Sequence, residues 1–430
     1  MSVDSALTPP RPPRSARGRL RRSLLATSLE AIAAEWVTAC AGGAALTAWA
    51  LQVGASPALV ALLAALPALA QVLHFPAARL TARHGPRRVA LAASIAARQP
   101  YLALVALPFL PLTRTGAQLV VAAVAVSSCA LASIAQQAWM IWTPALYRAP
   151  VRSRVLGRRA GRAAVSGAAA SLAVGVFLDG HAGAARVHAL SLLAILAWAA
   201  GLLAAFWLAR QAPPPRRERA MPSASRALAD GGVRRVLGYV CAWNAALGIT
   251  AAITALHMLQ GLHLGFVAVS VHGAGVAAGC LLGAPLWGKM LDRFGAGRVL
   301  VASTAGAASL PFLWLGIHAG SVFTLALDAA LGGTLLAGQA LASVALPLQI
   351  APRHRRAEVV AAFSTAGGLS FAAASLATGV LSDKLPLFVF IAGRVLLGRK
   401  LLFAAGGAVR LAAAALGLRA FGRAPSPSPA

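Results

Sequence analysis

The sequence predicts an all-α membrane protein with about twelve transmembrane helices, arranged as two pseudo-symmetric bundles of six. The first observation is composition: 59% of the 430 residues are hydrophobic and only 11% are charged, with a mean hydropathy of +0.74. Soluble domains carry about 25% charge, so this chain cannot cover a soluble surface and its expected solvent is the bilayer. The second observation is a series of long apolar runs, and the third is the placement of basic residues between them.

The apolar runs are long enough to cross about 30 Å of hydrocarbon. We expect spans at residues 23–48, 57–78, 89–110, 117–142, 163–180, 187–209, 236–256, 264–287, 298–318, 321–345, 357–380 and 401–420. One further apolar stretch, residues 385–398, is too short to span and contains Arg394, so we expect a re-entrant or interfacial segment there.

Along the chain, loops rich in basic residues alternate with loops that have few of them. One set of loops, together with the two termini, holds 31 of them, and the other set holds 6. Because loops rich in Arg and Lys stay in the cytoplasm, we expect a multi-pass protein of the cytoplasmic (inner) membrane with both termini in the cytoplasm. This topology also accounts for the net charge of +29. The basic residues form short clusters and no contiguous patch, so we expect no nucleic-acid partner.

The longest internal polar segment, residues 210–235, divides the spans six and six. We therefore expect a basic, disordered cytoplasmic N-terminus (1–22), a six-helix bundle (23–209), a cytoplasmic linker (210–235), a second six-helix bundle (236–420) and a cytoplasmic tail (421–430). The first apolar run lacks a convincing cleavage site, which favours a retained first span. The four cysteines lie inside apolar runs and form no C-x-x-C, so we expect no metal site and no cofactor.

Two loops carry related strings. Residues 288–295, after the eighth span, read GKMLDRFG, and residues 78–85, after the second span, read ARLTARHG. Aligned on the last glycine, both strings have an arginine two places earlier, and the two glycines are 210 residues apart. A second pair of similar loops places Pro150 and Pro352 at an offset of 202 residues. Two similar offsets indicate a duplicated six-span unit.

The string GKMLDRFG resembles the loop signature G-x-L-x-D-R-x-G of the major facilitator superfamily, and residues 139–159 resemble the loop between the fourth and fifth spans in a bacterial, twelve-span branch of it. The resemblance covers essentially the whole chain and implies a transporter built from two related halves. The first-half copy has Ala82 where the family has Asp. The proline-containing antiporter motif of the fifth span is not evident either, which argues against drug/proton antiport.

The resemblance and the glycine-rich loops imply a conformational lock between the halves. Glycines permit a tight turn and close helix approach, and an aspartate beside them can face a helix N-terminus or an arginine of the other half. We expect Asp292 to pair with an arginine beside the fifth span, and Glu358 to act similarly near Arg83; the alternative for Asp292 is a solvated loop carboxylate. The residues of this expected lock are Arg83, Gly85, Arg154, Arg158, Arg159, Gly288, Asp292, Arg293, Gly295 and Glu358.

Some charged residues fall inside the expected spans, where a charge costs about 2.5–3.5 kcal/mol and therefore needs a cavity or a partner. They are Glu30, Glu35, Arg98, Asp328 and Arg410. We expect Glu35 or Glu30 to carry a coupling proton or to pair with Arg98, with a fixed structural Glu–Arg pair as the alternative. Arg410 is expected to be a snorkelling residue. Candidates to line a polar pathway, or alternatively to bond neighbouring helices, are Gln71, His74, Gln99, Asn244 and Gln339.

These observations favour a secondary active transporter that moves a small solute by alternating access, coupled to protons, with its site between the halves. The second candidate is a non-transporting sensor, assembly factor or lipid-handling protein on the same fold. The sequence has no Walker A, H-E-x-x-H or G-x-S-x-G string, so neither ATP-driven transport nor an enzyme is expected. We expect a monomer surrounded by membrane lipids, with a small-molecule substrate.

Overall fold

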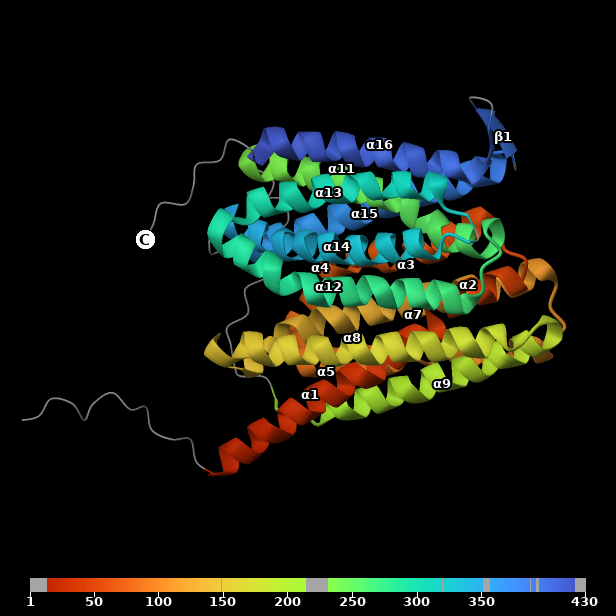
Figure 1. The fold of residues 1–430 in the computed structure, drawn as a ribbon. Helices are drawn as coiled ribbons and strands as arrows, with labels where there is room; N and C mark the ends of the chain where they lie inside the picture. The colour runs from red at the N-terminus through yellow and green to blue at the C-terminus, as the bar shows by residue number, and fades with distance from the viewer. Residues whose placement is uncertain are drawn as a thin grey trace, which may run out of the picture.

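The computed structural model describes residues 14–147, 149–213, 231–318, 320–350, 356–386, 388–391 and 394–421. Within these residues, twelve helical segments are long and apolar enough to cross a membrane. They run side by side and form two halves of six (Figure 1). Large apolar side chains such as Leu282 and Phe323 are 78% and 80% exposed, as a surface bathed in lipid requires. The predicted fold class is confirmed.

The N-terminal half contains six spans, three of which are divided into successive helices. They are α1 (Arg14–Ala41) with α2 (Gly43–Gln52); α3 (Pro57–Leu69), η1 (Ala70–Leu73) and α4 (His74–His84); α5 (Pro86–Ala96), α6 (Tyr101–Ala106) and η2 (Leu107–Phe109); α7 (Arg114–Trp142), followed by η3 (Thr143–Leu146); α8 (Ala149–Asp179); and α9 (Gly183–Ala209). The break between α1 and α2 falls at Gly43, whose φ of +45° favours glycine.

The C-terminal half repeats this order. It contains α11 (Gly231–Leu256) with the π-helical turn η4 (His257–Gly261), α12 (Phe266–Phe294), α13 (Ala296–Gly316), α14 (Val322–Ile350), α15 (Arg356–Lys384) and α16 (Gly398–Phe421). Between α15 and α16 lie the two short antiparallel strands β1 (Phe388–Ile391) and β2 (Arg394–Leu397).

Two sequence-based expectations need correction. Within residues 385–398, the described segments Phe388–Ile391 and Arg394–Leu397 are rich in residues that favour extended backbone and form paired antiparallel strands beyond the helix ends (Figure 1), which leaves the interfacial alternative and not the re-entrant one. Residues 14–22, expected to be disordered, are the start of α1, because Ala, Leu and Arg are good helix formers. Most of the expected terminal and linker segments lie outside the described residues, at positions 1–13, 214–230 and 422–430.

The loop repeat predicted from the sequence is visible in the backbone. Gly85 ends α4 with φ +86° and ψ 143°, and Gly295 ends α12 with φ +80° and ψ 164°. Each amide donates to the carbonyl four residues back, at 2.9 Å in both turns. Residues with a Cβ are strongly disfavoured in this region of φ and ψ, so glycine is required at both positions.

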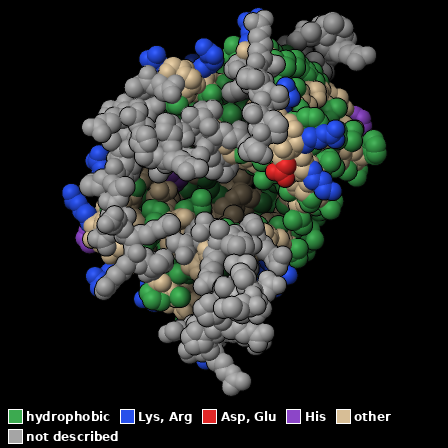
Figure 2. Space-filling view, turned by 90° about the vertical axis from the view of Figure 1, so that its left-hand side faces the viewer, with side chains coloured by type: hydrophobic (Ala, Val, Ile, Leu, Met, Phe, Trp, Pro, Cys, Tyr) green, Lys and Arg blue, Asp and Glu red, His purple; other side chains and the backbone are tan. Residues whose placement is uncertain are grey.

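The helices place their connections at two ends of the molecule. The turns at Gly85 and Gly295 lie at the left in Figure 1, and we call this the arginine-rich end because Arg87, Arg88 and Arg298 follow the turns. The hairpin and the connection from η4 to α12 lie at the right, at the arginine-poor end. The two halves meet where α3 packs against α15 and α8 packs against α12. Figure 2 looks onto the arginine-rich end and shows a hollow between the halves, with Lys and Arg side chains along the outer edge of this face.

Candidate functional site

At the arginine-poor end, two carboxylates join the halves by binding helix N-termini. Asp179, the last residue of α8, accepts hydrogen bonds from the amides of Phe266 and Val267 on α12, at 2.8 and 2.9 Å. Asp383, near the end of α15, accepts one from the amide of Ala58 on α3, at 3.3 Å. The first amides of a helix have no partner within it and carry the positive end of its dipole. We call these contacts the Asp179 clasp and the Asp383 clasp.

The two clasps are related by the internal repeat. Asp179 and Asp383 end the fifth and eleventh spans and are 204 residues apart, while their targets begin the second and eighth spans. Both helix termini are shaped for the contact. A Cβ on Gly265, just before α12, would overlap the Asp179 carboxylate, and Ser56 caps α3 at the amide of Leu59, which leaves the amide of Ala58 for Asp383.

The expected lock at the arginine-rich end is not formed in this state. Asp292 is exposed and forms no ion pair with any described residue, and Arg83 and Arg158 are exposed as well. Arg293 lies over the ring of its neighbour Phe294, at 5.3 Å. The side chains of Arg154 and Glu358 lie outside the described part of the chain. The lock therefore stays a prediction for a state in which this end is closed.

The partner of Glu30 is Arg159. The Arg159 guanidinium donates to the Glu30 carboxylate at 2.8 Å and lies 4.3 Å from the centre of the Trp139 ring. Arg98, which was considered as the partner, instead packs its side chain against Gly201 on α9, and its Nε is buried without a hydrogen bond. Glu30 thus matches the alternative of a fixed structural pair between α1 and α8.

Glu35 lies farther along α1 and has no such partner. Its side chain is half-buried and faces α8, where a Cβ added to Gly167 would come within 2.7 Å of the carboxylate. Among the described residues no hydrogen bond or ion pair satisfies it. A carboxylate inside the membrane without a fixed counter-charge is the group best suited to gain and lose a proton.

The C-terminal half encloses a cavity of about 280 Å³ with three charged or titratable side chains. His272 on α12 pairs with Asp328 on α14, with 2.9 Å between Nε2 and the carboxylate. Arg410 on α16 donates to the carbonyl of Ala307 at 3.2 Å and to the hydroxyl of Thr250. Arg410 is therefore held inside the bundle by its neighbours, and the expectation of a snorkelling residue is wrong. Sequence reasoning missed His272, although a polar residue in an apolar span was the available signal.

The predicted pathway residues are not brought to one site. Asn244 donates to the carbonyl of Val240 on its own helix, at 2.8 Å, and Gln99 accepts from the indole of Trp198 at 3.4 Å. Gln99 matches the alternative of bonding a neighbouring helix, whereas Asn244 bonds within its own helix. The side chains of Gln71, His74 and Gln339 are half-buried and form no hydrogen bond within the described ranges.

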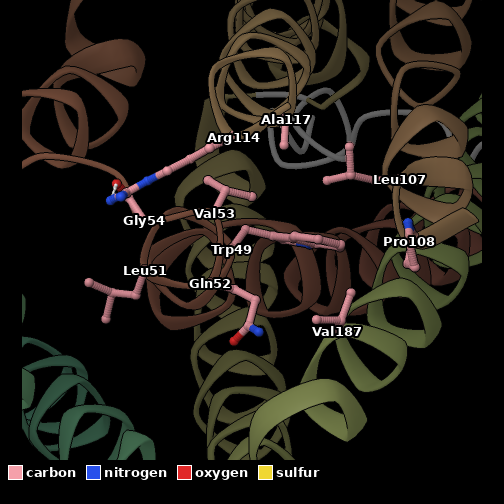
Figure 3. A pocket seen from close by; sticks show the side chains of 10 residues that line it. All are labelled: Trp49, Leu51, Gln52, Val53, Gly54, Leu107, Pro108, Arg114, Ala117 and Val187. Atoms are coloured by element: carbon pink, nitrogen blue, oxygen red, sulfur yellow. Dashed lines mark hydrogen bonds between the residues drawn. The ribbon is translucent and has the colours of Figure 1, made fainter. Parts of the chain in front are cut away.

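A second cavity, of about 410 Å³, lies at the arginine-poor end of the N-terminal half (Figure 3). Its charged residue, Arg114, reaches over to the loop after α2 and donates to the carbonyl of Gly54 at 2.5 Å. Gln118 donates to the same carbonyl at 3.0 Å. Gly54 has a φ of +65°, so Arg114 holds a tight turn at the edge of this cavity.

The chain folds into two six-helix halves that are joined at one end and separated by a hollow at the other. These features define a class: this is a multi-pass membrane protein with the two-bundle fold of alternating-access transporters. The family model described as Major Facilitator Superfamily matches residues 235–430. The resemblance predicted from the loop string is thereby confirmed, by sequence in the C-terminal half and by fold along nearly the whole chain. A search of curated protein sequences gives no match.

Solved transporters share the fold at low sequence identity. A D-xylose–proton symporter superposes with a TM-score of 0.68 and 13% identity over 93% of this chain and 97% of the symporter. The nucleoside transporter NupG gives a TM-score of 0.63 and 13% identity over 94% of this chain and 98% of NupG. A bacterial homologue of the iron transporter ferroportin, in an inward-facing state, gives a TM-score of 0.67 and 13% identity over 96% of this chain and 100% of the homologue. These proteins are transporters and their cargoes differ, so the likeness carries the fold alone.

Proposed function

We propose that this protein is a secondary active transporter that moves a small solute across the cytoplasmic membrane by alternating access, coupled to protons. One observation carries the proposal: two repeat-related clasps hold the halves together at one end, while the other end is hollow between the same halves (Figure 2). This asymmetry is what one state of an alternating-access cycle requires. The fold and the family support it.

The arginine-rich end faces the cytoplasm in this proposal. The positive-inside rule places Arg-rich loops there, and with an even number of spans both termini are cytoplasmic. The structure then corresponds to a state open to the cytoplasm and closed by the clasps toward the outside. The transporter works as a monomer in lipid, without a nucleic acid, a cofactor or a catalytic step.

The cycle exchanges one set of interhalf contacts for another. Opening the outer end separates Asp179 and Asp383 from the helix termini that they bind. Closing the cytoplasmic end brings Asp292 to an arginine beside α8, which supplies the predicted lock. Carboxylates thus stabilise each closed end through charge-assisted hydrogen bonds, so that the two states differ little in free energy.

The coupling proton binds Glu35. Ionised Glu35 forms no ion pair with a described residue, so the membrane interior disfavours its charge. Protonation removes that cost, whereas Glu30 stays paired with Arg159 and keeps α1 and α8 together. A proton gradient therefore drives the conformational cycle through Glu35.

Flux measurements in proteoliposomes test the proposal. The purified protein is assayed with a panel of nucleosides, pentoses and organic acids, with and without an imposed proton gradient. We expect at least one solute to be taken up faster with the gradient, and Glu35→Gln to weaken that dependence while keeping exchange of solute without a gradient. Binding without flux would instead favour the sensor.

A further inference from the structure

The cavity inside the C-terminal half contains a cation with unused hydrogen-bond donors. A guanidinium has five N–H groups. Those of Arg410 bind the carbonyl of Ala307 and the hydroxyl of Thr250, while Nε is buried without a partner. Arg410 also lines the cavity. Unused donors on a buried cation create a place for an acceptor that the chain does not supply.

The charge balance around Arg410 sets what can bind. Asp328 is the nearest acidic group, but its carboxylate is bound to His272. The other titratable groups near this region include His257, whose ring stacks edge-on with Trp314, and Lys400, which donates to the carbonyls of Leu315 and Ile317. Arg399 lies next to Lys400 and also acts on His257. Asp179 is occupied by its clasp on the first turn of α12. With His272 neutral, the pair of Arg410 and Asp328 leaves the cavity without net charge.

An anion entering alone would therefore leave one net negative charge inside the membrane, which is costly. One proton entering with it restores neutrality. The Nε2–H of His272 donates to Asp328, so the lone pair on Nδ1 accepts the proton and the ring becomes an imidazolium that keeps the same hydrogen bond. No other bond is made or broken, and the proton leaves from Nδ1 when the anion leaves.

The walls of the cavity select the rest of the ligand. Phe371 and the stacked rings of Trp314 and Phe403, whose centroids are 5.0 Å apart, line it together with aliphatic side chains. Such walls favour an apolar body. A dianion such as phosphate would keep a net charge even after His272 is protonated, and a cation would meet Arg410. The chemistry therefore fits one carboxylate on a small apolar group.

We propose that this cavity binds a small apolar monocarboxylate together with one proton, with the carboxylate on Arg410 and the proton on His272. The proposal deepens the proposed function, on which it rests for the movement of the ligand across the membrane. It names a carboxylate as the substrate class and makes His272 a second protonation site besides Glu35.

Calorimetric titration of the purified protein tests the binding step. The probes are benzoate and butyrate, with benzamide and benzylamine as neutral and cationic controls. We expect both carboxylates to bind more tightly at pH 6 than at pH 8, because each is bound together with one proton and protons are more abundant at the lower pH. Buffers of different ionisation enthalpy should report uptake of about one proton for each carboxylate bound. The two controls should not bind.

Variants separate the charge from the cavity. Arg410→Gln should weaken carboxylate binding at least about 50-fold, as loss of a buried ionic partner does, and His272→Gln should remove the difference between pH 6 and pH 8. Gly332→Val keeps every charge but fills the cavity beside Leu310, so it should also abolish binding and covers the case in which Arg410→Gln does not fold. Arg114→Gln, in the other cavity, should bind normally.

Absence of binding by both carboxylates, equal binding at the two pH values, or normal binding by Gly332→Val would each overturn the proposal. None of these outcomes would contradict alternating access, which is tested separately by measuring the distance between spin labels on the two halves. If the carboxylates bind and that distance never changes, the proposed transport fails and the binding site stands.

Discussion

Replacing Asp179 by Asn should open the arginine-poor end. The carboxylate of Asp179 accepts two amide hydrogen bonds, at 2.8 and 2.9 Å, and lies at the N-terminus of α12. Asn has the same shape but one acceptor oxygen and no charge. It therefore loses one charge-assisted hydrogen bond and the interaction with the helix dipole.

The magnitude follows from these contacts. A hydrogen bond to a charged group contributes about 1.5–3 kcal/mol and the dipole about 0.3–1 kcal/mol, so we take a loss of about 2 kcal/mol. Since about 1.4 kcal/mol is a factor of ten, the ratio of closed to open should fall about 30-fold. Asp383→Asn keeps an acceptor oxygen for its single contact of 3.3 Å but loses the charge, for which about 1 kcal/mol corresponds to a shift of about fivefold.

Double electron–electron resonance measures the shift. Spin labels at Ala184 on α9 and Val322 on α14, both exposed at the arginine-poor end, report the distance between the halves in a cysteine-free background. Asp179→Asn should add a population at longer distance, and Asp383→Asn a smaller one.

The control is Thr113→Ala, which removes an N-cap from α7 at the same end but within one half, so its distances should match the wild type. The reasoning is refuted if Asp179→Asn leaves the distribution unchanged, or if Thr113→Ala shifts it equally.

The remaining predictions concern stability. Glu30→Gln should leave Arg159 as an uncompensated buried charge, lowering the free energy of unfolding by about 3 kcal/mol; in thermal unfolding, adding Arg159→Gln should recover part of the loss, and no recovery would contradict a direct pair. Gly85→Ala and Gly295→Ala should each cost about 1–3 kcal/mol, because their φ values lie in a region essentially restricted to glycine. Gly288→Ala should be neutral or stabilising, since it is helical and a Cβ there meets no atom within 4 Å; equal losses at all three glycines would count against the backbone argument.

The parts of this fold that the sequence predicts are those set by local physics. The length of each span follows from the thickness of the bilayer's hydrocarbon core, and the side of each loop follows from its Arg and Lys content. The two glycine turns follow from the alignment of the two loop sequences. The Asp179 and Asp383 clasps could not be predicted in this way, because their partners are backbone amides far along the chain. Every residue except proline has a backbone amide, so no sequence motif identifies the amide that a carboxylate will bind.

The pairing of Glu30 shows a second limit. The sequence indicated Arg98 as a partner, and the choice of Arg159 over Arg98 depends on how α1, α8 and α9 are rotated about their axes. Helical periodicity fixes which residues share a face of one helix, but not which neighbour that face meets. His272 was missed for a related reason, since its role is set by Asp328 on another helix.

The turns at Gly85 and Gly295 also bear on the history of the chain. The strings ARLTARHG and GKMLDRFG that end in these glycines now share only the arginine and the glycine, yet the backbone leaves both helices with nearly the same φ. After an ancestral gene doubled, almost every side chain of the turn was free to drift in each copy, whereas the one position without a side chain was not. In such a protein the dihedral angle preserves common descent longer than residue identity does.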